Sequence, residues 1–127
     1  MKIAALVVLA AVSISACDLI GVESCDDETV PGINVVALDS ITGDTLRGVK
    51  ITVTAREGSY VETVETTPAA TEYVFPVALA RERPGTYTLQ VTAPGYLEWT
   101  QVDLRVDSEG CHARTVVVGP RLRRQVS

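Results

Sequence analysis

The chain contains 127 residues and has a formal net charge of −5. We expect residues 1–16 to be removed, and the remaining 111 residues are enough for one domain but not for two. The excess of acidic over basic side chains argues against nucleic acid as a partner. Val, Thr and Ile supply 35 of those 111 residues, and because β-branched side chains favour strands over helices, the composition predicts an all-β protein.

The first segment is typical of an export signal. Met1-Lys2 is a short positive region, and residues 3–14 are apolar except for Ser13, a stretch too short to cross about 30 Å of hydrocarbon as a helix. The next residues, Ile14-Ser15-Ala16-Cys17, resemble the lipobox of bacterial lipoproteins. That resemblance implies cleavage before Cys17 and attachment of diacylglycerol to its sulfur. The alternative is a secreted protein with an ordinary cleavage site.

Lipidation predicts a location in the bacterial cell envelope. Two or three acyl chains anchor a protein firmly, since each buried CH₂ contributes about 0.8 kcal/mol. We therefore expect the protein to be anchored to a membrane through lipid and to face the periplasm or the exterior. Asp18 resembles the inner-membrane retention signal of some Gram-negative sorting systems, but the choice of membrane stays open. Residues 17–31 follow as an acidic tether, with five carboxylates between Cys17 and Glu28.

The two other cysteines predict a disulfide. Cys25 and Cys111 are an even pair in an oxidising compartment, and a bridge between them would join both ends of the domain. A loop of this length contributes roughly 4 to 5 kcal/mol in the chain-entropy model, although about 2 to 4 kcal/mol is common. A metal site is the alternative, but Cys25, Cys111 and His112 supply too few ligands for a tetrahedral zinc site. We expect no metal and no cofactor.

Seven strands are predicted in chain order. Strict alternation is clearest at 49–55 and 87–93, where every second residue is apolar, so both segments should be half-buried strands. A more buried strand precedes the turn that begins at Asp39. Pro76 predicts that the strand containing it is either an edge strand or a bulged one. The spacing of strands and turns is typical of a β-sandwich. The predicted strands cover 33–39, 49–55, 59–66, 73–79, 87–93, 97–106 and 111–118.

The connections show recognisable turn chemistry. Glu57-Gly58 predicts a hairpin, and Pro84-Gly85 and Pro94-Gly95 each suit a type II turn because glycine accepts a positive φ. The apolar phase changes between Trp99 and Val102, which predicts a β-bulge near Thr100-Gln101. Residues 119–127 are expected to form a solvated, frayed basic tail. The alternative is that the arginines of this tail contact anionic lipid or the acidic tether. These arginines are Arg121, Arg123 and Arg124.

Two segments resemble the carboxypeptidase regulatory-like family. Residues 35–53 match its D-x-x-T-G-x-P-L-x-G-V-x-V pattern, with Thr45 in place of the usual proline. Residues 84–96, with Tyr73 and Leu79 before them, match its Y-x-L...L-x-P-G-x-Y-x-L-x-V-x-A-x-G-Y pattern, and Thr71-Glu72 replaces the frequent Asp-Gly. The resemblance implies a seven-stranded transthyretin-like (prealbumin-like) Greek-key β-sandwich over residues 32–118. Domains of this family usually serve as structural or binding modules.

Candidate chemistry is sparse. His112 is the only histidine, and no G-x-S-x-G elbow presents a serine, so a small hydrolase needs His112 to line a pocket beside a serine and a carboxylate. Asp39 and Asp44 flank Gly43 and suit Asx-turn hydrogen bonding better than calcium. The carboxylates Asp103, Asp107 and Glu109 are expected to be exposed, and acidic proteins commonly carry such groups.

The aromatic pair Tyr96 and Trp99 follows a Pro-Gly turn at one end of the predicted sandwich. Loop-borne rings can stack on sugars or peptides, but packing on the core is favoured because the chain has few aromatic residues. We therefore expect a non-enzymatic envelope lipoprotein whose β-sandwich does structural or protein-binding work. The alternative is a carbohydrate-binding module that uses Tyr96 and Trp99, so the partner is a membrane through the anchor and either an envelope protein or a glycan.

Overall fold

The computed structural model describes residues 28–67 and 75–126. This part of the chain is all-β and contains no helix. Its strand segments are β1 (Ile33–Val35), β2 (Leu38–Asp39), β3 (Thr52–Glu57), β4 (Tyr60–Glu65), β5 (Val77–Leu79), β6 (Gly85–Thr92), β7 (Trp99–Val106), β8 (Ser108–Glu109), β9 (His112–Ala113), β10 (Val116–Val118) and β11 (Arg121–Leu122).

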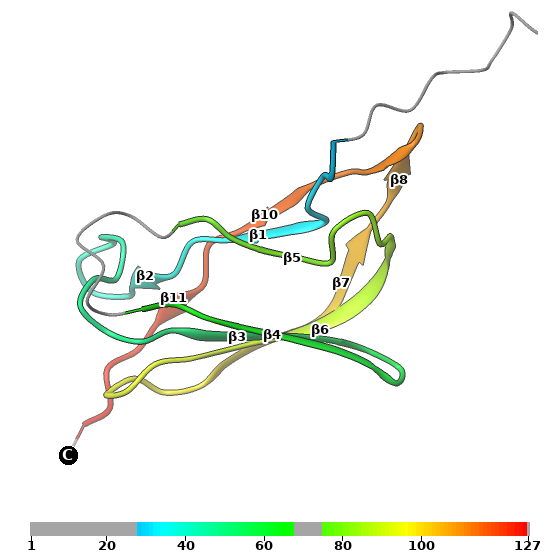
Figure 1. The fold of residues 1–127 in the computed structure, drawn as a ribbon. Coiled ribbons are helices and arrows are strands. Elements are labelled where there is room, and N and C mark those ends of the chain that lie inside the picture. The colour runs from blue at the N-terminus through cyan, green and yellow to red at the C-terminus, as the bar shows by residue number, and fades with distance from the viewer. Residues whose placement is uncertain (1–27, 68–74, 127) are drawn as a thin grey trace, which may run out of the picture.

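The strands form two layers that face each other (Figure 1). One layer is an antiparallel four-stranded sheet in the order β4-β3-β6-β7. The opposite layer holds a three-stranded sheet in the order β10-β1-β5, in which β10 runs parallel to β1 and β5 runs antiparallel to it. The parallel pair β11-β2 continues this second layer, and the hairpin β8-β9 extends from the end of β7. The layers are consistent with a β-sandwich.

Period-two alternation places the core between the layers. Side chains on one face of β3 and β6 are buried, as predicted for Ile51, Val53 and Ala55 and for Tyr87, Leu89, Val91 and Ala93. The opposing layer contributes Ile33, Val35, Val77, Leu79 and Val118 to the same cluster. Because successive side chains of a strand point to opposite faces, each of these strands buries one face.

The structure divides the predicted strands more finely. The segment 33–39 splits into β1 and β2, and the segment 111–118 splits into β9 and β10. The predicted hairpin after Glu57 is confirmed, since Glu57 pairs with Tyr60 across a two-residue turn. β5 lies at the edge of its sheet, as Pro76 indicated. Residues 73 and 74 of the strand predicted there lie outside the described residues.

The predicted irregularity in β7 exists but lies two residues further along the chain. The register of β6 and β7 shifts between Tyr87, which pairs with Leu104, and Leu89, which pairs with Gln101. Val102 and Asp103 therefore lie opposite the single residue Thr88, so β7 has one extra residue, and Asp103 has a φ of 56°. This bulge lets Trp99 and Gln101 share the inner side with Leu104 and Val106 despite the phase change.

One of the two predicted Pro-Gly turns is confirmed and the other is wrong. At Pro94-Gly95, glycine has a φ of 85° and the Tyr96 N–H donates to the Ala93 carbonyl at 3.1 Å, as a type II turn requires. Gly85 instead opens β6 without a positive φ, and Ala80 and Glu82 adopt the left-handed conformation. A Cβ at Gly85 would overlap the Glu57 carboxylate. Glycine is therefore needed at this position because the Glu57 side chain lies close to the backbone.

The prediction that residues 119–127 form a frayed tail is wrong for the described part. Arg121 and Leu122 pair with Leu38 and Asp39 as β11, and the Leu38 N–H donates to the Pro120 carbonyl at 2.8 Å. Pro120 and Leu122 are fully buried. The physical reason is a short period-two pattern: the inward-facing residues alternate with exposed arginines, and their burial outweighs the solvation of the charges.

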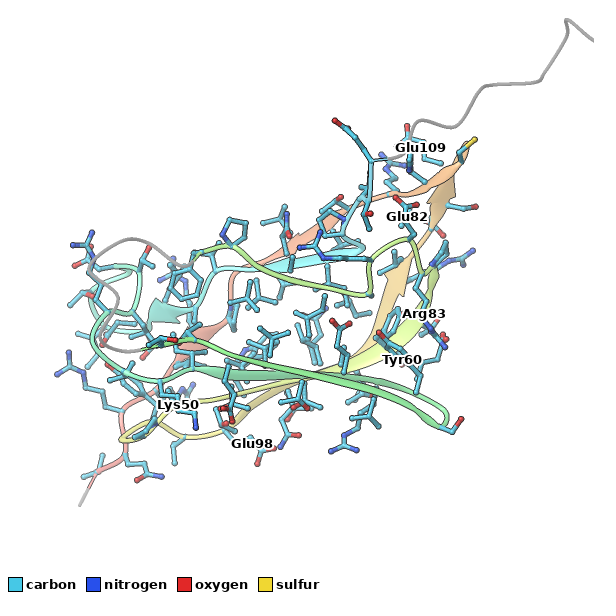
Figure 2. All side chains as sticks on the ribbon, in the orientation of Figure 1. Lys50, Tyr60, Glu82, Arg83, Glu98 and Glu109 are labelled. Atoms are coloured by element: carbon cyan, nitrogen blue, oxygen red, sulfur yellow. The ribbon has the colours of Figure 1, made fainter. Side chains whose placement is uncertain are left out.

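A polar cluster closes the sandwich near the β3–β4 hairpin (Figure 2). The Tyr87 hydroxyl donates to the Arg83 carbonyl at 2.6 Å and accepts from Arg83 Nη1 at 3.0 Å. The Arg83 guanidinium also binds Glu57 Oε1 at 2.6 Å and stacks 3.8 Å from the centre of the Tyr60 ring. Burial, with help from the Glu62 carboxylate, raises the pKa of Tyr60 to about 12. The cluster fixes the start of β6 against the hairpin.

The Tyr87 hydroxyl should contribute measurably to stability. Tyr87→Phe leaves the Arg83 carbonyl without its hydroxyl donor, and we expect the free energy of unfolding to fall by about 1–3 kcal/mol. The measurement is urea denaturation followed by circular dichroism. Tyr60→Phe is the matched control, because its hydroxyl bonds to the Glu62 side chain at a half-buried site, and its loss should be smaller. Equal stability of Tyr87→Phe and the unmodified chain would contradict the assignment.

Candidate functional site

The sandwich has two ends with different polar clusters (Figure 1). We call the end formed by residues 28–32, 80–86 and 107–113 the N-terminal end, because the described chain begins there. The opposite end consists of residues 39–46, 93–98 and 119–126, and we call it the C-terminal end. In each cluster a carboxylate joins segments that are far apart in the sequence.

Asp39 organises the C-terminal end. Its side chain is buried, and its Oδ1 accepts from the Ile41 N–H at 2.8 Å and from the Thr42 N–H at 3.2 Å. Its Oδ2 accepts from the Tyr96 hydroxyl at 3.2 Å and from Arg124 Nε at 3.0 Å. One carboxylate thus holds the 39–46 turn, the 93–98 turn and the C-terminal segment together.

These donors favour the charged form of Asp39. The pKa of Asp39 is lowered to about 2, mainly by the backbone N–H groups of Ile41 and Thr42 and also by the Arg124 guanidinium, against the opposing effect of burial. The same ion pair raises the pKa of Arg124. Asp39 is therefore a permanently ionised acceptor under physiological conditions. The predicted Asx-turn hydrogen bonding is confirmed for Asp39, whose Oδ1 accepts from the Ile41 N–H.

The structure places Tyr96 and Trp99 against the core. Both side chains are half-buried and pack on the hydrophobic cluster. The Tyr96 hydroxyl is bound to Asp39, and Tyr96 also bridges to Arg124 in a short antiparallel contact. Trp99 opens β7 and pairs with Val91. The two rings are thus parts of the packing, not a free pair on a flat surface.

A shallow, open depression lies beside the Asp39 turn. Gly43, Asp44, Thr45 and Arg47 line it. Gly43 has a φ of 77°, and its N–H donates to the Asp39 carbonyl at 2.8 Å. Across the described ranges, no three His, Cys, Asp or Glu side chains gather into a group that could hold a metal ion.

Glu82 has the equivalent role at the N-terminal end (Figure 2). Its Oε1 accepts from the Val30 N–H at 2.5 Å and lies 2.7 Å from His112 Nδ1. Its Oε2 accepts from the Ala113 N–H at 3.3 Å. The Val30 N–H is the main cause that lowers the pKa of Glu82. The carboxylate therefore ties the incoming chain to strand β9.

The three cysteines are only partly within the described chain. Cys111 is exposed at the tip of the β8–β9 hairpin, directly before His112. Cys17 and Cys25 lie outside the described residues, so the lipid and the disulfide stay predictions. The tether at 17–31 is described only from Glu28 onward.

The candidate catalytic groups do not assemble into one site. Asp103, Asp107 and Glu109 are exposed, and Asp107 pairs with Arg105 at 2.7 Å. His112 contacts Glu82, whose two oxygens also bind backbone N–H groups. Glu82 therefore contacts two backbone N–H groups and one imidazole nitrogen.

Sequence reasoning missed the roles of Glu82 and Arg83 and assigned Arg124 to a frayed tail. None of the three lies in a motif that predicts its contacts. The one available signal was for Arg83, because a tyrosine four residues later can bond back to the chain, as Tyr87 does. Arg124 is 85 residues from Asp39, and nothing in the local pattern links them.

The comparisons with known proteins add no family. No protein-family model matches the chain, and no curated protein matches it. Within residues 28–67 and 75–126, no helix has the length and hydropathy needed to cross a bilayer. The site is therefore interpreted from its own geometry.

The lowered pKa of Asp39 predicts a specific sensitivity to acid. The stabilisation that this carboxylate gives is complete above pH about 4 and is lost as the pH falls toward 2, because protonation removes the acceptor charge. Asp39→Asn should lower the denaturation midpoint at pH 7 and flatten the loss of stability between pH 4 and 2. The measurement is the urea midpoint as a function of pH.

The matched control is Asp44→Asn in the same turn. The Asp44 side chain is exposed, and no hydrogen bond to its carboxylate is recorded among the described residues. This variant should keep the pH profile of the unmodified chain. If Asp39→Asn and the unmodified chain lose stability in parallel below pH 4, Asp39 is not the acid-sensitive group.

Proposed function

We propose that the mature chain is a non-enzymatic envelope lipoprotein that presents a small β-sandwich for structural or protein-binding work. In this proposal Cys17 carries the lipid, residues 17–31 form the tether and the sandwich is held by its N-terminal end. The observation that carries the proposal is the lipobox Ile14-Ser15-Ala16-Cys17 directly after the apolar segment.

The position of the two ends supports this arrangement. The described chain begins at the N-terminal end, and the loops of the C-terminal end lie on the opposite side of the layers (Figure 1). A lipid-borne tether would then reach the first end and leave the second accessible.

The sandwich is further proposed to have the transthyretin-like Greek-key topology of carboxypeptidase regulatory-like domains. Two features support this. The segments 35–53 and 84–96 carry the family's turn glycines and inward-facing residues. The Tyr87 hydroxyl bonds to the backbone four residues upstream, which resembles the tyrosine corner of Greek-key sandwiches.

A Cys25–Cys111 disulfide is part of the same proposal. Glu82 Oε1 binds both the Val30 N–H and His112 Nδ1, so the chain enters the sandwich beside the residue that follows Cys111. Cys25 precedes Val30 by five positions, and an extended chain of that length spans up to about 17 Å. From Val30, the chain is therefore long enough to bring Cys25 toward Cys111, where a disulfide needs a Cα separation of about 5.5–6 Å.

A carbohydrate-binding module has less support. It would use Tyr96 and Trp99, but both rings are half-buried and the Tyr96 hydroxyl is already bound to Asp39. Sugar-binding platforms need a broad aromatic face in contact with solvent. Protein binding is therefore the better supported use of this end.

The lipid anchor is tested by mass spectrometry of the protein extracted from membranes of a bacterial host. We expect a mature chain that begins at Cys17 with diacylglycerol attached, whereas Cys17→Ser should leave the membrane fraction or accumulate unprocessed. Cys25→Ser is the matched control and should stay membrane-bound. An unmodified Cys17 in the membrane-extracted protein would remove this part of the proposal.

The disulfide is tested by thiol titration of unreduced, denatured protein. We expect no free thiol from Cys25 or Cys111, and a loss of about 2–4 kcal/mol in the free energy of unfolding for Cys111→Ser. The double variant Cys25→Ser with Cys111→Ser should be no less stable than either single variant, since all three lack the same bond. Two free thiols per chain would refute the bridge.

A further inference from the structure

The C-terminal end carries an unusual combination of exposed aliphatic and cationic side chains. Ile41 is 76% exposed and Leu97 is 48% exposed. Arg121 and Arg123 are exposed on the adjacent strand β11 and just after it. We call these four residues the arginine–aliphatic surface.

Short backbone contacts hold the four residues in one region. The Leu97 N–H donates to the Arg123 carbonyl at 2.7 Å. Arg121 Nη1 lies 3.8 Å from the position that a Cβ would take at Gly43, so its guanidinium sits over the turn that carries Ile41. Asp39 binds the Ile41 N–H and the Tyr96 hydroxyl at the centre of this region. The surface is therefore built on three segments that one buried carboxylate fixes.

The charges of this surface are available to a partner. Several other cations are neutralised within the chain: Lys50 by Glu65, Arg83 by Glu57, Arg105 by Asp107 and Arg124 by Asp39. No carboxylate lies within ion-pair distance of Arg121 or Arg123 among the described residues. Asp44 and Glu98 are exposed acids at the same end, and Gln90 Nε2 donates to the Glu98 carboxylate. Arg121 and Arg123 are thus two exposed positive charges with no carboxylate partner among the described residues, in a chain whose net charge is −5.

Arginine is enriched at protein interfaces, and exposed aliphatic side chains gain free energy when a partner covers them. A membrane would also accept such a surface, but under the proposed anchoring this end lies away from the tethered side (Figure 1). A purely anionic polymer would gain nothing from covering Ile41 and Leu97. The composition and position together favour a protein partner.

We propose that the arginine–aliphatic surface docks an acidic segment of an envelope protein. Carboxylates of the partner would pair with Arg121 and Arg123, and an apolar side chain between them would cover Leu97 and Ile41. This inference rests on the proposed function and names the surface and the chemistry of its partner. Electrostatic attraction would make the association dependent on salt concentration.

The test is site-specific photo-crosslinking of the full-length lipidated protein in its native envelope. A photoreactive amino acid replaces Leu97 or Ile41 at the surface, and Val61 or Val117 as controls on β4 and β10, which are 50% and 71% exposed. We expect protein adducts from Leu97 and Ile41 but not from the controls. Mass spectrometry of the adduct should identify a crosslinked peptide that contains Asp or Glu.

Charge reversal distinguishes specific docking at this surface from crosslinking that occurs only because a residue is exposed. Arg121→Glu with Arg123→Glu should lower the adduct yield about tenfold or more, since it replaces attraction by repulsion. Arg56→Glu with Arg114→Glu is the matched control, because it changes the net charge equally at exposed sites on other elements. Unchanged thermal unfolding of both double variants shows that the fold is retained, and Arg121→Gln with Arg123→Gln serves if the first variant unfolds.

The outcomes distinguish this proposal from the proposed function. Adducts from Val61 or Val117 alone would be consistent with a protein-binding lipoprotein, but they would contradict docking at the arginine–aliphatic surface. Adducts with lipid, equal yields in both charge-reversal variants, or no adduct at Leu97 and Ile41 would also overturn it. Loss of the unmodified protein from the membrane fraction would instead contradict the anchor, whatever the adduct pattern.

Discussion

The two stacked layers of the sandwich are closed at their ends by carboxylates that accept hydrogen bonds from distant segments. In this sandwich the sheets cover the two faces of the core. The loops at each end are held in place by polar groups. Asp39 does this at one end, with four donors from three segments. Glu82 does it at the other end, with Val30, His112 and Ala113. Both carboxylates are held ionised by backbone N–H groups, which supply charge stabilisation without a mobile partner.

Under the proposed anchoring, the two ends would have different uses. Glu82 joins the incoming chain to the hairpin that bears Cys111, so mechanical load on a tether would pass directly into the sheets. Asp39 holds the turns at the other end together through its hydrogen bonds. Arg121, Arg123 and nearby aliphatic side chains are exposed to solvent there. A small module with one loaded end and one ordered, exposed end suits the presentation of a binding surface.

The sequence predicted the core well because alternation is a local signal. The inner faces at 49–55 and 87–93 followed directly from period two, and the Pro94-Gly95 turn followed from its chemistry. The roles of Glu82 and Arg124 could not be predicted, because each depends on a partner at least thirty residues away. The segment at 119–126 was misassigned because its arginines obscured the alternation of Pro120 and Leu122. The bulge in β7 was expected, but side-chain phase alone does not locate it to the residue.

The central claim is that the sandwich is held by its N-terminal end and presents its C-terminal end away from the membrane. The most direct measurement places a fluorescent amino acid at Glu109 or at Arg123 in the lipidated protein, reconstituted in vesicles with nickel-chelating headgroups. The account predicts stronger quenching by the bound nickel at Glu109, because that end is close to the bilayer. Equal quenching at both positions, or stronger quenching at Arg123, would contradict it.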